Sequence, residues 1–142
     1  MPLTGQSHIR IARPSRDLAA AERFWVQGLG LSVLYRGEGD HAAGEHDLLM
    51  VGLPDAPWHL ELVSGSALVD GSEQALAPRP TTEDLLVVYL DEPVSEALLA
   101  TLAEHGGRRV ASPNPYWNEW GATVEDPDGY RLVLCSRGWS NS

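Results

Sequence analysis

Several residue types that mark whole classes of protein are scarce in this chain of 142 residues. One cysteine, Cys135, excludes an internal disulfide. The chain has 10 basic against 20 acidic residues and a net charge of −10, which argues against nucleic acid and anionic membrane surfaces as partners. No apolar run approaches the ~20 residues of a membrane span, and the N-terminal stretch MPLTGQSHIR lacks the apolar core of a signal peptide. We therefore expect a cytoplasmic protein.

The remaining composition is that of a globular domain with an unusual aromatic content. Apolar residues make up 43% of the chain, enough for a normal core. Five tryptophans stand against one phenylalanine, and tryptophan favours positions where one ring edge stays wet. The acidic excess supports solubility, and it also fits a preference for cationic ligands.

The hydrophobic pattern occurs twice along the chain, as strand, helix and three strands. In the first half it predicts a helix over residues 17–28 and strands over 7–13, 31–36, 46–52 and 58–63. In the second half it predicts a helix over 92–106 and strands over 84–90, 108–111, 121–125 and 130–135. The expected organisation is a module over 1–64, a linker without regular structure over 65–82, and a module over 83–142.

The last two predicted strands enclose the clearest turn of the chain. Asp126-Pro127-Asp128-Gly129 has aspartate first, proline second and glycine last, as a tight β-turn requires. Before this hairpin, residues 112–120 form an aromatic stretch that we expect to be a loop.

These motifs resemble the vicinal oxygen chelate superfamily, which includes glyoxalase I, extradiol dioxygenases and bleomycin-resistance proteins. The similarity lies in two βαβββ modules and in the sequence DPDGYRLVL at 126–134. More narrowly, IARP at 11–14, NPYW at 114–117 and EDPDG at 125–129 resemble the YycE-like bacterial subgroup. The resemblance implies an α+β fold in which two βαβββ modules form a cupped mixed sheet, and it implies a homodimer.

Metal-dependent members of that superfamily take two ligands from each module, one on its first strand and one on its last. Carried across, these positions fall on His8, Glu61, Leu85 and Val133, of which only His8 and Glu61 are metal-ligand types. The resemblance therefore implies either no cofactor or a divalent metal ion in an incomplete site. A metal-dependent lyase, isomerase or dioxygenase would need further ligands from His59, His46 or His41. Glu61 is then also the candidate general base.

Strand parity gives a second view of the same surface, because alternate residues share one face of a strand. It predicts that His8, Arg10, His59 and Glu61 share a face in the first module, and that Leu85, Val87, Tyr89, Arg131 and Val133 do so in the second. Polar groups in one module and apolar groups in the other suit an organic ligand with a polar end. The candidate ligand-binding residues are therefore His8, Arg10, His59, Glu61, Tyr89, Trp117, Trp120 and Arg131.

Three functional hypotheses remain open at this point. The first is a small-molecule-binding protein of the glyoxalase/bleomycin-resistance type that lacks a complete four-ligand metal site. The second is the metalloenzyme with His8 and Glu61 as ligands, so the sequence leaves open whether the protein is an enzyme. The third is a structural or interaction protein whose cleft is filled by its own side chains.

Overall fold

The computed structural model describes residues 2–142, and the backbone alone at residues 67–69. The chain divides into two compact units, the first ending at Pro78 and the second beginning at Arg79. Each unit contains a four-stranded mixed sheet, which confirms the predicted α+β class with two similar modules. None of the helices in this described part is long and apolar enough to cross a membrane.

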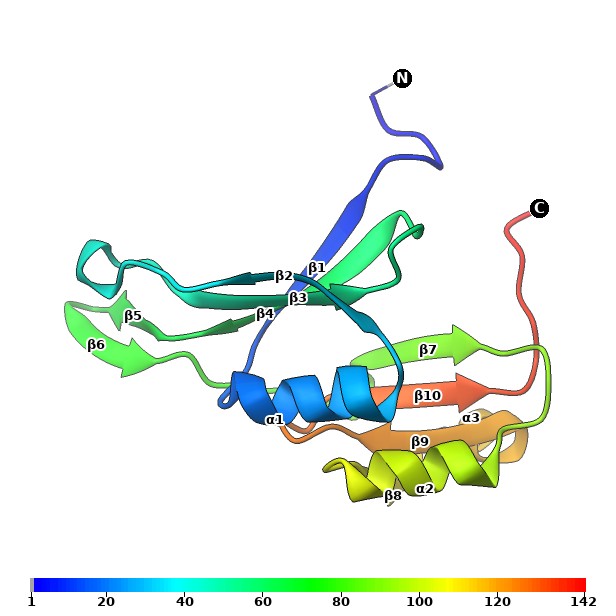
Figure 1. Cartoon of the computed structure of the whole chain (residues 1–142). Coiled ribbons are helices and arrows are strands. Elements are labelled where there is room, and N and C mark those ends of the chain that lie inside the picture. Colours follow the sequence, from blue (N-terminus) through cyan, green and yellow to red (C-terminus); the bar gives the residue numbers. More distant parts are fainter. Residues whose placement is uncertain (1) are drawn as a thin grey trace. The chain divides into compact units, whose positions relative to one another are not determined.

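The strands of the first sheet lie in the order β1-β4-β3-β2, with β1 parallel to β4 and the other pairs antiparallel (Figure 1). This unit consists of β1 (Ile9–Pro14), α1 (Leu18–Glu22), η1 (Arg23–Gly28), β2 (Ser32–Gly37), η2 (His41–Ala43), β3 (Asp47–Gly52), β4 (Trp58–Ser64), β5 (Ser66–Val69) and β6 (Ser72–Ala75). The predicted order of strand, helix and three strands is therefore present, with β5 and β6 added to it.

One face of the first sheet forms the core of its unit. Helix α1 contacts β3 and β4. The inward side chains of these strands are at most 1% exposed, namely Leu49, Val51, Leu60 and Leu62. Burying each such side chain stabilises the fold by about 1.5–3 kcal/mol. The alternate positions of β4 carry His59 and Glu61, which consequently face the other way, onto what we call the open face of the first sheet.

The predicted helix over residues 17–28 occurs as two segments. The Asp17 side chain accepts a hydrogen bond from the Ala20 amide and caps α1. The helix then widens into η1, where the Leu29 amide donates to the Phe24 carbonyl five residues earlier. The wider turn accompanies the complete burial of two neighbours in sequence, Phe24 and Trp25.

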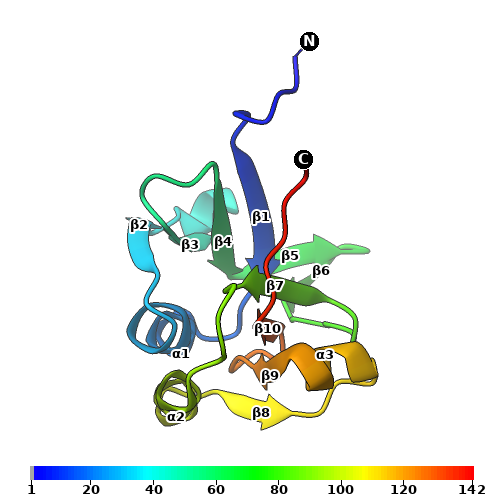
Figure 2. The same ribbon diagram turned by 90° about the vertical axis from the view of Figure 1, so that its right-hand side faces the viewer.

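The second sheet has the strand order β7-β10-β9-β8, with β7 parallel to β10 and the other pairs antiparallel. Its helix α2 is capped by the Ser95 hydroxyl, which accepts from the Leu98 amide, and contacts β8. Helix α3 contacts β9 and β10 (Figure 2). This unit consists of β7 (Leu85–Tyr89), α2 (Glu96–Glu104), β8 (Arg108–Val110), α3 (Pro115–Trp120), β9 (Gly121–Glu125) and β10 (Arg131–Cys135).

The turn between β9 and β10 is held by one carboxylate. Asp126 Oδ1 accepts hydrogen bonds from the amides of Asp128, at 2.9 Å, and Tyr130, at 2.8 Å. Gly129 has φ of 90°, a conformation in which a side chain would be strained. The sequence DPDG therefore closes the last hairpin of the sheet, as predicted.

Two predicted irregular stretches turn out to be regular. The expected aromatic loop contains α3, because Asn114 accepts from the Tyr116 amide as an N-cap and Pro115 occupies the first turn. The expected linker over 65–82 contains the hairpin of β5 and β6. Its two turn residues, Asp70 and Gly71, have φ of 51° and 78°, as a type I′ turn requires.

Candidate functional site

Four polar side chains meet on the open face of the first sheet. Arg10 lies directly across from His59 in the β1–β4 pairing, and His8 immediately precedes β1. His8 Nε2 lies 2.7 Å from His59 Nδ1, and Arg10 Nε donates to His59 Nε2 at 3.1 Å. Arg10 Nη1 lies 3.0 Å from Glu61 Oε2. The side chains that parity placed on one face therefore form one connected network, which we call the Arg10 network.

The hydrogen bonds assign the protons in the Arg10 network. Arginine can only donate, so His59 Nε2 must accept and His59 Nδ1 must carry the proton. His59 Nδ1–H then donates to His8 Nε2, which leaves the proton of a neutral His8 on its Nδ1. The chain of hydrogen bonds thus runs from Arg10 through His59 to His8, and it requires both histidines to be neutral.

The surroundings of His59 favour this neutral state. Burial lowers the pKa of His59 below its ordinary value of 6.5, repulsion by any charge on His8 and by the Arg10 guanidinium acts in the same direction, and Glu61 opposes them. Arg10 is half-exposed, whereas the Glu61 side chain is 13% exposed. The Glu61 carboxylate is thus the more deeply buried partner of the ion pair, and the Arg10 guanidinium neutralises its charge.

This arrangement does not fit a metal ion. A metal on His8 Nε2 would have to displace His59, and one on Glu61 Oε2 would have to displace the Arg10 guanidinium. Among the described residues there is no group of three or more His, Cys, Asp or Glu side chains placed to hold a metal. The ligand types expected at His8 and Glu61 are present, but both are engaged with protein partners.

The corresponding face of the second sheet carries both apolar and charged side chains. The register places Leu85 opposite Arg131 and Val87 opposite Val133, so these side chains share one face. Arg131 Nε donates to Glu125 at 3.3 Å, and Arg108 also pairs with Glu125. Leu85 and Val133, the two positions where metal-dependent relatives would place ligands, therefore offer none.

Two family models match the two halves of the chain. The YycE-like N-terminal domain matches residues 9–63, and the YycE-like C-terminal domain matches residues 83–136. YycE of Bacillus subtilis, described as uncharacterized, is 40% identical over 129 residues, which are 90% of this chain and 86% of that protein. The chain belongs to the YycE-like family. The narrower resemblance seen in the sequence is thereby confirmed.

Solved structures place the YycE-like chain among glyoxalase and bleomycin-resistance folds. A crystal structure of B. subtilis YycE matches with a TM-score of 0.77 and 36% identity, over 96% of this chain and 95% of that one. TnmS3, an antibiotic-binding protein from Streptomyces sp., matches with a TM-score of 0.59 and 26% identity, over 96% and 100%. A Mn(II) complex of the fosfomycin resistance protein FosX from Listeria monocytogenes shares the fold at a TM-score of 0.64, 13% identity, and coverage of 96% and 94%.

Each aromatic candidate of the second unit contacts a different side chain. Trp117 contacts Tyr116 edge-on, with ring centroids 5.0 Å apart. The Trp120 ring is covered by the Arg137 guanidinium, 3.9 Å from the ring centroid. Tyr89 instead lies near Trp139, with centroids 6.2 Å apart. None of these three contacts joins two of the candidates Tyr89, Trp117 and Trp120 to each other.

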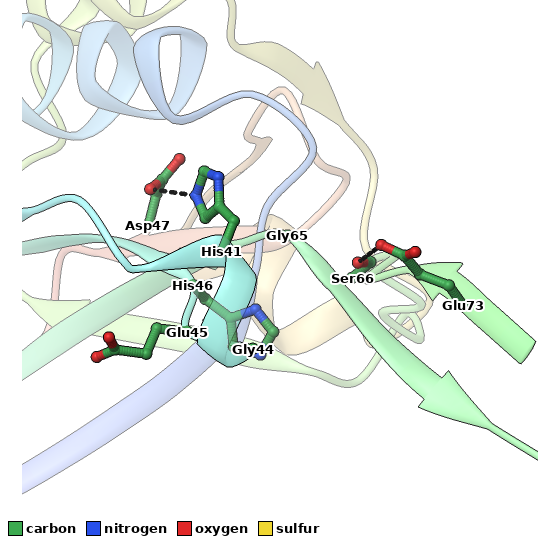
Figure 3. Close-up of a pocket in the computed structure, with 8 residues that line it drawn as sticks. All are labelled: His41, Gly44, Glu45, His46, Asp47, Gly65, Ser66 and Glu73. Atoms are coloured by element: carbon green, nitrogen blue, oxygen red, sulfur yellow. Dashed lines mark hydrogen bonds and ion pairs between the residues drawn. The ribbon is translucent and has the colours of Figure 1, made fainter. Parts of the chain in front are cut away.

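His41 and His46, the possible extra metal ligands, line a different cavity of the first unit, of about 240 Å³ (Figure 3). His41 Nε2 lies 2.9 Å from Asp47 Oδ1, and this carboxylate raises the pKa of His41 while its own pKa is lowered. The His46 ring packs on Gly65, where an added Cβ would lie 2.5 Å from His46 Nδ1. His8, His59 and Glu61 do not line this cavity.

Sequence reasoning missed a further cavity of the second unit, of about 500 Å³, beyond the ends of β7 and β10. Its lining includes Tyr89, Asp91, Tyr116 and Trp139. Only Tyr89 was a candidate residue. The available signal was the isolated Trp139 in a short polar C-terminal segment, where no core strand or helix needs a tryptophan.

Proposed function

We propose that this protein binds a small organic molecule without a resident metal ion, and that a polar group of the ligand contacts the Arg10 network. The observation that carries the proposal is the network itself. It holds an ion pair and two hydrogen-bonded histidines on one face of the first sheet. Arg10 Nε donates to His59, and Arg10 Nη1 pairs with Glu61. Binding pockets fix their ligands with a few polar groups placed in this way.

Two properties of the network suit a hydrogen-bonded ligand better than a metal. Its charges balance, because Arg10 neutralises Glu61 and the chain of hydrogen bonds requires neutral histidines. Its outer end is the Nδ1–H of the exposed His8, a donor available to a ligand. The relationship to the antibiotic-binding protein TnmS3 adds support at 26% identity. We further propose that the protein is a cytoplasmic homodimer. Light scattering on the purified protein measures its molar mass and thereby tests whether it is a dimer.

The test uses the five histidine Cε1–H resonances of the chain as local reporters. The protein is titrated with bleomycin, fosfomycin and a library of planar aromatic acids and amides. We expect a saturable shift at His8 and His59, with His41 unmoved because it lies outside the network. Arg10→Met should weaken binding about tenfold by removing a charge-assisted contact. His41→Gln is the matched control and should bind as the wild type does.

Two results would overturn this proposal. In the first, no compound of the library gives a saturable shift of the His8 or His59 resonance. The other is stoichiometric metal in the purified wild-type protein that is lost in His8→Ala, which would favour the metalloenzyme with His8 and Glu61 as ligands. Elemental analysis of both proteins, purified without chelators, distinguishes these cases.

A further inference from the structure

The cavity beyond the ends of β7 and β10 combines exposed aromatic rings with an acidic group. Because β7 and β10 are parallel, both strands end at the same edge of the sheet. Tyr89 ends β7, Tyr116 comes from α3, and Trp139 comes from the segment after β10. Tyr89 and Tyr116 are each 39% exposed and Trp139 is 74% exposed, so ring surface remains open to solvent.

Backbone contacts hold the acidic group of this cavity in place. The Asp91 amide donates to the Arg137 carbonyl at 3.1 Å, and the Leu90 amide donates to the Cys135 carbonyl at 2.8 Å. The Asp91 carboxylate lies against Gly138, where an added Cβ would be 3.1 Å from Asp91 Oδ1. These contacts tie the exit of β7 to the segment that carries Trp139.

The charges at this cavity leave Asp91 without a counter-ion. Among the described residues, no side chain forms an ion pair with its carboxylate. Arg137 also lines the cavity, but its guanidinium is seated on the Trp120 ring at 3.9 Å from the centroid. The Trp139 indole N–H donates to Asn141 Oδ1 at 3.0 Å, which leaves the ring faces available.

We propose that this cavity is a binding site for a small organic ammonium ion. A cation is attracted by the faces of tyrosine and tryptophan rings within about 6 Å of their centroids. Tyr89 and Trp139, whose ring centroids lie 6.2 Å apart with planes inclined by 32°, supply two such rings to the lining of the cavity. The Asp91 carboxylate supplies the opposite charge, and the net charge of −10 favours the approach of a cation. The residues of this site belong to the second unit, and the inference does not depend on the proposed function.

The probe is tetramethylammonium chloride, and the readout is the set of five tryptophan indole N–H resonances. Sodium chloride keeps the ionic strength constant, and tert-butanol is the neutral probe of similar size. We expect a saturable shift of the Trp139 resonance with tetramethylammonium, and about tenfold weaker binding of tert-butanol. Asparagine tolerates the left-handed backbone at position 91, where φ is 55°. Asp91→Asn should therefore keep the backbone, and by removing the negative charge it should weaken binding of tetramethylammonium about fivefold.

Two further variants complete the test. Trp139→Leu should weaken binding about fivefold as measured by calorimetry. Glu92→Gln removes a neighbouring exposed carboxylate that does not line the cavity, and should leave binding unchanged. Equal binding of tert-butanol would overturn the proposal, as would equal effects of Asp91→Asn and Glu92→Gln, or a saturable shift confined to other tryptophans. The far-UV circular dichroism of each variant verifies its fold.

Discussion

The two partners of the Arg10–Glu61 ion pair should respond very differently to truncation. Arg10→Met keeps most of the aliphatic stem but leaves a carboxylate that is 13% exposed without its counter-ion, and removes the donor to His59 Nε2. Unpaired buried groups of this kind cost about 1–3 kcal/mol each, reduced here by access of water to Glu61. We expect a loss of about 2–3 kcal/mol in the free energy of unfolding.

Glu61→Gln should cost much less. The amide oxygen can still accept from Arg10, whose side chain is 52% exposed and can be hydrated where it loses its partner. Exposed or half-exposed ion pairs contribute about 1 kcal/mol or less, so we expect a loss below that value. In melting temperature the two changes correspond to about 6–9 °C and less than about 3 °C.

The double variant Arg10→Met/Glu61→Gln gives the most decisive measurement. It removes the unpaired carboxylate that destabilises Arg10→Met, so it should be about 1 kcal/mol more stable than Arg10→Met alone. All four proteins are compared by urea unfolding at neutral pH, followed by far-UV circular dichroism. A cost of Glu61→Gln as large as that of Arg10→Met would contradict this prediction, and so would a double variant less stable than Arg10→Met.

Two further predictions concern local packing and pH. Gly121→Ala should destabilise the protein by about 3 kcal/mol, because the new Cβ would collide with the Leu134 carbonyl oxygen. Thermal unfolding measures this loss. The control is Gly5→Ala, where no atom lies within 4 Å of the added Cβ. Because the pKa of folded His59 lies below its unfolded value of 6.5, the unfolded chain binds more protons below that pH. The contribution of His59 to the free energy of unfolding is therefore fully present above pH 6.5 and declines as the pH falls. Urea titrations at several pH values from about pH 7.5 to about pH 5.5 should show that the free energy of unfolding declines less steeply in His59→Gln than in the wild type.

The sequence predicted the parts of the fold that follow from local rules. Alternation located the strands of both sheets, and DPDG located the final hairpin, because these depend on neighbours in the chain. Hydrophobic periodicity does not predict the helix α3 or the hairpin of β5 and β6, because only short-range signals mark these two elements. Asn114-Pro115 is a helix start, and Asp70-Gly71 is a hairpin turn. Both signals were present without a hydrophobic pattern around them.

The candidate site was predictable as far as strand parity reaches. Parity fixes the face of a side chain, and it correctly placed His8, Arg10, His59 and Glu61 together. It does not fix rotamers or partners, so the direct contact between the two histidine rings emerged only from the structure. Side chains from loops and termini escape parity altogether, and for this reason Asp91 and Trp139 could not be located from the sequence.

The fixed donor role of Arg10 makes the Arg10 network directional, and direction is a form of selectivity. Since Arg10 Nε cannot accept, neither hydrogen bond along the chain to His8 can reverse while the network is intact. The outermost group is therefore held as an N–H donor. A ligand that presents a carbonyl, carboxylate or ether oxygen there meets its complement. One that presents only an N–H must break a bond between protein groups before it can form its own.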